Sequence, residues 1–355
     1  MLLHCDEWDR VVALPRHKFV TGATLLQLTS GIPQGSVLGP ILFVIYINDL
    51  LDKLESDCYM FADDTKIFRQ IASTSDNDIL QSDVKKLEDW SATWLIRFHP
   101  DKCKVVTAGK AERQTYDYIL SNTTLEHGEK EKYIGVTIDS KLTFEHHMNE
   151  KINKANSIMG PIRRTFTCLD EETFLLLNKA LIRPHLEYAN ALWSPYKIKD
   201  ITAIENVQRR ATKLVLSLKN LEYEDRLRKL KLPTLKYRRL PGDMIETYKL
   251  TSGIYDSTLP NLLHYNKDTR MRGHNKKLSK QRCNKNIRAN FFTQRIVTTW
   301  NQLPDGIVSA PTMQSFENRL DKYWNNLEMK YNFKTDTGTG TGLSQEELLE
   351  LNTVA

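Results

Sequence analysis

Residues 58–68 read Cys58-Tyr59-Met60-Phe61-Ala62-Asp63-Asp64-Thr65-Lys66-Ile67-Phe68. Two short runs rich in apolar residues flank the Asp63-Asp64 pair, and Asp supports tight turns. The pattern therefore predicts a β-hairpin with both carboxylates at its tip. Like charges held this closely repel each other unless a cation lies between them, and hard oxygen ligands of this kind suit Mg²⁺. Asp63 and Asp64 are thus candidate metal ligands. The alternative is an ordinary turn with two solvated side chains.

A glycine- and proline-rich loop, Gly31-Ile32-Pro33-Gln34-Gly35-Ser36, precedes this hairpin in the sequence. Its two glycines allow the backbone to approach a ligand closely, and Pro33 stiffens it. Gln34 and Ser36 offer polar contacts, so the loop is a candidate binding segment. The apolar run that follows it, up to residue 51, is long enough for a helix, and Pro40 fits the first turn of one.

The pattern downstream of the hairpin changes from mixed to helical. Two short strands are predicted over residues 103–108 and 133–138, and from residue 141 onward the apolar period is 3.6. The sequence therefore predicts an α+β fold that continues into an all-helical part. Helices are predicted over residues 77–98, around 144–159, from a capping Asp170 to Pro184, and over 201–218.

Length and composition are those of an ordinary globular protein. The 355 residues suffice for about two domains, with 40% hydrophobic and 26% charged residues. The five cysteines include no Cys-x-x-Cys pair, which excludes a disulfide scaffold and a zinc finger and favours a reducing compartment. The longest apolar run, residues 41–47, is too short to span a membrane, and the acidic start is unlike a secretory signal. We therefore expect a nuclear or cytoplasmic protein that is neither secreted nor a membrane protein.

Positive charge is concentrated in the second half of the chain. Residues 206–300 hold 22 Lys and Arg against 7 Asp and Glu, a balance of +15, whereas the rest of the chain has a balance of −9. This asymmetry indicates that one region meets a polyanion. The candidate nucleic-acid-binding residues are Lys276, Lys277, Lys280 and Arg282. The alternative is a solvated, Lys-rich loop.

Several of these segments together resemble the reverse transcriptases of non-LTR retrotransposons. The loop and the residues after it, Gly31 to Pro40 followed by Tyr46-Ile47-Asn48-Asp49-Leu50, resemble palm motif B, and Phe61-Ala62-Asp63-Asp64 resembles motif C. The resemblance extends over roughly residues 8–325. Further similar segments are Trp90 with residues 98–104 (motif D), Tyr133-Ile134-Gly135-Val136 (the primer-grip turn, motif E), and residues 183–188 and 208–211 (a helical thumb).

The resemblance implies an RNA-directed DNA polymerase that transfers nucleotides with two Mg²⁺ ions. It implies that Asp63 is a direct metal ligand and that Asp64 lies beside it. Pro33, Gln34, Gly35 and Ser36 would then pack against the template base and the incoming nucleotide. Either Lys102 or Lys104 would approach the leaving pyrophosphate, a choice that the resemblance leaves open. The implied partners are an RNA template, a DNA primer and deoxynucleoside triphosphates, whereas the oligomeric state is not implied.

The sequence departs from the family in one respect that concerns catalysis. The family uses a further metal-binding Asp in motif A, well upstream of motif B, but only 30 residues precede Gly31, and Asp6 and Asp9 are too close to it. The expectation is a chain that begins within the palm, lacks the fingers and has an incomplete two-metal site. We therefore expect the chain by itself to be inactive. The alternatives are a non-catalytic nucleic-acid-binding remnant and a poorly folded relic without a settled function.

The expected organisation has four parts. They are a partial palm of antiparallel strands and helices over residues 1–140, a helical thumb-like region over 141–220, a basic, mostly helical carboxy-terminal region over 221–330, and a flexible tail over 331–355 with a Thr-Gly repeat.

Overall fold

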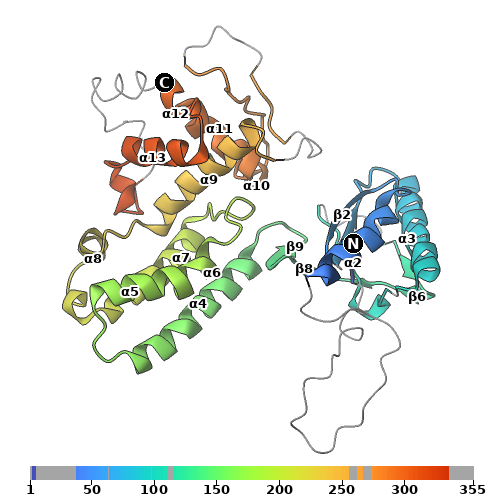
Figure 1. Ribbon diagram of the computed structural model, residues 1–355, viewed down its shortest axis with the longest axis horizontal. Coiled ribbons are helices and arrows are strands. Elements are labelled where there is room, and N and C mark those ends of the chain that lie inside the picture. Colours follow the sequence, from blue (N-terminus) through green and yellow to red (C-terminus); the bar gives the residue numbers. More distant parts are fainter. Residues whose placement is uncertain are drawn as a thin grey trace, which may run out of the picture. The chain divides into compact units, whose positions relative to one another are not determined.

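The computed structural model divides the chain into two compact units, Met1–Leu142 and Thr143–Ala355 (Figure 1). The loop at residues 31–36, Asp63 and the tail from residue 336 lie outside the residues that the structure describes, and for residues 2–4 only the backbone is described. The described residues are 2–4, 37–62, 64–96, 98–109, 116–255, 262–266 and 273–335.

The first unit combines a small sheet with helices, as the α+β prediction requires. Its largest sheet has the order β2-β3-β1-β4-β7, and its neighbouring strands are antiparallel except for the parallel pair β4 and β7. In chain order its elements are β1 (Leu2–His4), α2 (Leu38–Ile47), a 3-10 turn (Asn48–Leu51), β2 (Asp57–Phe61), β3 (Asp64–Phe68), α3 (Thr74–Trp94), a 3-10 turn (Pro100–Lys102), β4 (Lys104–Val105), β5 (Ile119–Leu120), β6 (Thr123–Thr124), β7 (Glu126–His127), β8 (Lys130–Tyr133) and β9 (Val136–Asp139).

Helix α3 builds the core of this unit against the sheet. A capping box formed by Ser73 and Asp76 starts the helix, which therefore begins a few residues before the predicted position. Apolar side chains at helical spacing, including Val84 and Leu87, are fully buried in one cluster with Ile67 of β3. The helix thus holds the inner face of the hairpin in place.

The strand predictions of this unit need correction at two places. The strand expected over 103–108 is only the two-residue β4. The strand expected over 133–138 is instead the hairpin β8–β9, because Ile134 and Gly135 adopt positive φ values of 43° and 74° and turn the chain back. Glycine permits this backbone geometry, whereas the alternation of apolar residues on either side resembles one continuous strand.

The second unit is helical, as the 3.6 period predicts, and its first helices α4 to α7 form a bundle (Figure 1). The predicted cap is confirmed, because an oxygen of Asp170 accepts the Thr173 N–H at 2.8 Å. The elements are α4 (Glu145–Thr165), α5 (Glu171–Leu177), a π-helical turn (Asn178–Ile182), α6 (Arg183–Glu187), α7 (Ile198–Ala211), 3-10 turns (Thr212–Leu214, Leu216–Leu218), α8 (Tyr223–Lys229), α9 (Leu235–Thr251), α10 (Asn286–Ala289), α11 (Phe292–Asn301), α12 (Asp305–Val308), α13 (Met313–Tyr323) and a 3-10 turn (Glu328–Lys330).

Two helix predictions of this unit also differ from the structure. The helix expected over 201–218 ends at Ala211 and continues only as short 3-10 turns. The basic region is not helical over residues 262–266 and 273–285, which form an extended segment with a bridge between Tyr265 and Leu278. The apolar spacing over residues 212–218 did not distinguish the two 3-10 turns there from a continuing helix.

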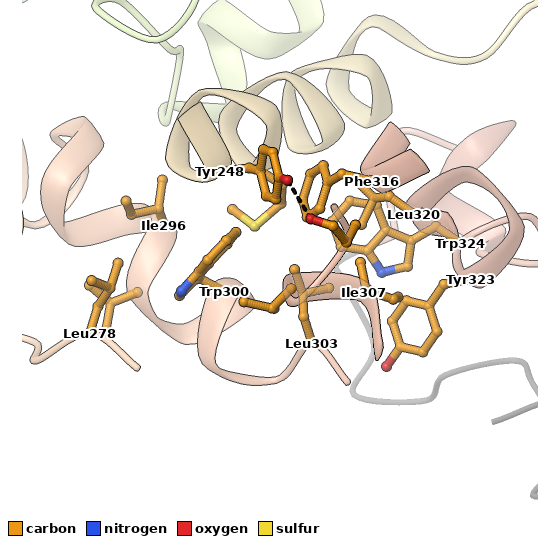
Figure 2. Close-up of a cluster of buried hydrophobic side chains, with 14 of the residues drawn as sticks. Tyr248, Leu278, Ile296, Trp300, Leu303, Ile307, Phe316, Leu320, Tyr323 and Trp324 are labelled. Atoms are coloured by element: carbon orange, nitrogen blue, oxygen red, sulfur yellow. Dashed lines mark hydrogen bonds between the residues drawn. The ribbon is translucent and has the colours of Figure 1, made fainter. Parts of the chain in front are cut away.

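An aromatic core of the second unit lies where α9 packs against α11 and α13 (Figure 2). Tyr248 stacks on Phe316 with ring centroids 4.4 Å apart, and its hydroxyl donates a hydrogen bond to the carbonyl of Ala310. Trp300 is fully buried beside Phe316. Of the aromatic residues in the basic region, Phe292 belongs to this core, whereas Tyr265 is exposed. Among the described residues, no helix is long and apolar enough to cross a membrane.

Candidate functional site

The hairpin that carries the acidic pair is formed by β2 and β3, as the sequence predicts. Phe61 pairs with Asp64, so the connection consists of Ala62 and Asp63, and Ala62 has a positive φ of 53°. Asp64 is therefore the first residue of β3 and not part of the turn, which corrects the predicted tip by one residue. Two-residue hairpin loops favour positive φ values, and the φ of Ala62 agrees with this preference.

Asp64 lies on the open face of the sheet. Successive strand residues point to opposite faces, so Asp64 shares its face with Lys66 and Phe68, whereas Thr65 and Ile67 point inward and are buried. The neighbouring strand adds Tyr59 and Phe61 to the same face through the Tyr59–Lys66 and Phe61–Asp64 pairs. The side chains of Tyr59, Phe61 and Phe68 are 42%, 59% and 40% exposed.

Lys66 and Tyr133 extend this face towards the β8–β9 hairpin. The Lys66 ammonium lies 4.8 Å from the centroid of the Tyr133 ring, a cation–π contact. Burial lowers the pKa of Lys66, and burial together with the nearby charge of Asp64 raises the pKa of Tyr133. Tyr133 belongs to the segment predicted to form the primer-grip turn, and the structure brings it to the face that carries Asp64.

Asp83 on α3 holds the segment that leads into β2. Its side chain is fully buried, and its oxygens accept the backbone N–H groups of Glu55 at 3.1 Å and Ser56 at 2.8 Å as well as the Lys86 ammonium at 2.9 Å. Burial raises the pKa of Asp83, but hydrogen bonds from Ser56, Lys86 and Glu55 outweigh this effect and leave it below its ordinary value. The sequence reasoning missed Asp83, although a carboxylate beside the apolar positions Leu80, Val84 and Leu87 of a helix is a usable signal.

We expect Asp83→Ala to lower the free energy of unfolding of the first unit by about 1–3 kcal/mol, because it leaves the buried N–H of Ser56 without an acceptor. Chemical denaturation measures this change. Because the folded-state pKa of Asp83 is lowered, its contribution is present above the ordinary Asp pKa and is lost as the pH falls through the folded-state value.

Asp89→Ala is the matched control for this prediction, since Asp89 is exposed on the same helix and pairs only at the surface with Lys85. We expect the control to change stability by less than about 1 kcal/mol. Equal stability of the two variants would contradict a positioning role for Asp83.

The two lysines considered for motif D lie in different settings. Lys102 is exposed at the end of the 3-10 turn Pro100–Lys102. Lys104 begins β4, and its ammonium lies 3.8 Å from a carboxylate oxygen of Glu126. The choice between them stays open.

The carboxylate of Asp64 has the hard oxygen donors that suit Mg²⁺. Asp63 and the loop residues Pro33, Gln34, Gly35 and Ser36 lie outside the described part of the chain, so the approach of that loop to the hairpin stays a prediction. Within the described ranges, no group of three or more His, Cys, Asp or Glu side chains is placed to hold a metal ion.

The four basic candidates lie on one extended segment, residues 273–282, which we call the strap. Lys276 and Lys277 are half-buried, whereas Lys280 and Arg282 are exposed. The Lys276 ammonium lies 3.3 Å from the Ser252 hydroxyl and 5.9 Å from the Tyr248 ring centroid, so this side chain packs on α9. The structure thus brings the four residues together but separates their roles.

Comparison with protein families gives one match. Residues 11–138 match the family described as "Reverse transcriptase (RNA-dependent DNA polymerase)", a range that includes the loop at 31–36, the acidic pair, Lys102 and Lys104. No solved structure matches the chain.

Among similar curated proteins, the "RNA-directed DNA polymerase from mobile element jockey" of Drosophila melanogaster is 29% identical over 138 residues, which cover 36% of this chain and 15% of that protein. The protein of the same name from Drosophila funebris is 28% identical over 178 residues, covering 46% and 19%. The "Probable RNA-directed DNA polymerase from transposon X-element" of Drosophila melanogaster is 24% identical over 200 residues, covering 53% and 22%. Residues 11–138 are thus similar to the reverse transcriptase family, and the chain spans at most 22% of the length of these relatives.

Proposed function

We propose that this chain is part of an RNA-directed DNA polymerase of a non-LTR mobile element, and that the β2–β3 hairpin carries the metal-binding carboxylates of its polymerising site. The observation that carries the proposal is the position of Asp64. This residue begins β3 directly after a two-residue loop, on the open face of a sheet, within the range that matches the reverse transcriptase family.

Asp63 and Asp64 would hold Mg²⁺ at the hairpin. Mg²⁺ bound there supplies charge neutralisation on the attacking 3′-oxygen and on the leaving phosphate. The loop residues 33–36 would bind the template base and the incoming nucleotide, and Lys102 or Lys104 would approach the leaving pyrophosphate. The open sheet face, with Tyr59, Lys66 and Tyr133 next to Asp64, would lie against the nucleic acid.

On this proposal the first unit corresponds to a partial palm, helices α4 to α7 to a thumb, and residues 221–330 to a basic carboxy-terminal region. We further propose that these 355 residues do not by themselves form a complete polymerising site, because residues 1–30 contain no recognisable motif A carboxylate. Loss of one electrostatic contact to the transition state costs about 10²–10³ in rate, and a metal ligand shared by two ions should cost more. The chain alone is therefore expected to bind metal weakly and not to polymerise.

Metal binding by the purified chain tests the hairpin site. Mn²⁺, followed by water proton relaxation as a stand-in for Mg²⁺, is expected to bind, and Asp63→Asn/Asp64→Asn is expected to weaken this binding at least about 10-fold. The reason is that even outer-shell groups of metal sites contribute 10–100-fold. Asp57→Asn is the matched control, because Asp57 is exposed at the other end of the same hairpin. Unchanged Mn²⁺ binding in the double variant would contradict the site.

A primer-extension assay on an RNA template with Mg²⁺ is expected to give no product with this chain. Templated synthesis that Asp63→Asn abolishes would show that a further carboxylate completes the site, and would overturn the proposed incompleteness while supporting the polymerase.

A second candidate function is nucleic-acid binding without catalysis. The strong positive balance of residues 206–300 favours it, and it does not require polymerisation.

A further inference from the structure

The strap is held along both of its edges. On one edge, Asn266 donates its backbone N–H to the carbonyl of Lys277 at 2.8 Å, and Ser279 donates to the carbonyl of His264 at 2.6 Å. On the other edge, side chains of α11 take the place of a neighbouring strand. An extended segment bonded on both edges in this way has a fixed course across the surface.

Three side chains of α11 make the second edge. The indole N–H of Trp300 donates to the carbonyl of Lys276 at 2.8 Å. The Asn301 amide both donates to the carbonyl of Leu278 and accepts its N–H, each at 2.8 Å. The Gln294 side-chain oxygen accepts the N–H of Gln281 at 2.9 Å.

Inward anchors complete the attachment of the strap. His274 and Leu278 are each 2% exposed, and the His274 ring is hydrogen-bonded to the carbonyl of Trp300 at 3.0 Å. Lys276 packs on α9, as described above. These contacts hold His274, Lys276 and Leu278. The side chains of Lys280 and Arg282, nearer the end of the strap, lie in solvent.

The exposed end of the strap and the start of α10 are basic throughout. Residues 273–290 contain six Lys and Arg and no Asp or Glu. Lys280, Arg282 and Lys285 are exposed, and none of the three forms an ion pair with another described residue. Arg288 is also exposed, and its guanidinium lies 3.3 Å from the Gln281 side-chain oxygen. Among the described residues no acidic side chain pairs with Lys280, Arg282 or Lys285, so a polyanion that binds there would relieve the repulsion among these charges.

We propose that Lys280, Arg282 and Lys285 form a site for the phosphate backbone of nucleic acid, that Asn301 positions this site through the strap, and that Lys276 serves packing instead. The ligand is a phosphodiester chain and not a base sequence, because cationic side chains without organised base-reading groups contact phosphates. The site lies in the second unit and does not depend on the hairpin carboxylates or on polymerisation.

The test measures binding of the full chain to a mixed-sequence single-stranded RNA and to a DNA duplex of equal length over a series of salt concentrations. Lys280→Ala/Arg282→Ala/Lys285→Ala is compared with Arg163→Ala/Arg164→Ala/Lys179→Ala. The control removes the same charge from exposed basic residues of the second unit that lie outside residues 206–300, so it separates a local site from a general effect of net charge.

The strap variant is expected to weaken binding and to reduce the log–log salt slope by about 2 on RNA and by slightly more on duplex DNA, at about 0.7 and 0.9 per phosphate contact. The control should keep the wild-type slope. An unchanged slope in the strap variant, or an equal change in the control, would overturn the proposal. If the wild-type chain bound polyglutamate but neither nucleic acid, the proposal would also be overturned. That result would indicate an acidic protein partner.

Asn301→Ala tests the positioning role, because it leaves every basic residue in place and removes both bonds to Leu278. It should weaken RNA binding while keeping the salt slope. Wild-type affinity in this variant would show that the strap does not need its α11 attachment to bind.

Discussion

Trp300→Ala is expected to lower the free energy of unfolding of the second unit by about 3–5 kcal/mol. The side chain is fully buried beside Phe316 (Figure 2), and its ring centroid lies 6.1 Å from that of Phe316. The centroid of the His274 ring lies 5.8 Å away. Truncation leaves a large cavity and also removes the donor for the Lys276 carbonyl. Denaturant unfolding measures the total loss, and hydrogen exchange over residues 273–282 shows whether the strap opens first.

Two further variants separate packing from hydrogen bonding at this position. Trp300→Phe keeps much of the ring volume but leaves the Lys276 carbonyl without its donor, so we expect a smaller loss of about 1–3 kcal/mol. Trp94→Ala is the control, because Trp94 is 38% exposed in the first unit. If Trp300→Ala were no less stable than this control, the aromatic core would not be the main source of stability of the second unit.

Arg295→Met is expected to destabilise the second unit by about 3–5 kcal/mol, because it leaves a buried carboxylate without its partner. The Arg295 guanidinium donates to both oxygens of Asp243, at 2.8 and 2.7 Å, and to the carbonyls of Asn190 and Ala191. The pair joins α11 to α9 and to the segment after α6. Urea denaturation at neutral pH measures the loss.

The pH dependence of this variant follows from the environment of Asp243. Burial raises the pKa of Asp243, and the charge of Arg295 opposes that increase. Without Arg295 the pKa of Asp243 rises further, and a folded-state pKa above the unfolded value makes stability increase as the pH falls. The destabilisation by Arg295→Met should therefore be largest at neutral pH and smaller in acid. The double variant Asp243→Asn/Arg295→Met should recover part of the loss, and equal stabilities of the single and double variants would contradict this account.

The sequence predicted those features that local patterns determine. The β2–β3 hairpin follows from two apolar runs around an acidic turn, α2 from an apolar run with Pro40 in its first turn, and α5 from its Asp170 cap. The β8–β9 hairpin was missed because its turn at Ile134-Gly135 interrupts an apolar alternation that fits a single strand equally well. The positive φ values of Ile134 and Gly135 decide between one continuous strand and a hairpin.

The parts of the candidate site that depend on tertiary contacts were not predictable in the same way. Asp63, Asp64 and the choice of Lys102 or Lys104 could be named from the motifs as candidates. Asp83 could not, because it acts through backbone N–H groups that lie far from it in sequence. The course of the strap depends on Gln294, Trp300 and Asn301, which have no local signature of binding an extended segment. Charge counting found the basic region, but only the contacts of Lys276 distinguish a packing lysine from an exposed one.

The attachment of the strap has an evolutionary consequence. Its course is determined by backbone hydrogen bonds and by inward residues such as His274 and Leu278, whereas Lys280, Arg282 and Lys285 contribute charge without packing. Exposed substitutions of this kind usually change stability by less than about 0.5 kcal/mol. Related chains can therefore gain or lose positive charge at these three positions one substitution at a time without losing the fold. If the strap binds a polyanion as proposed, its affinity can change in this way while the stability of the protein stays the same.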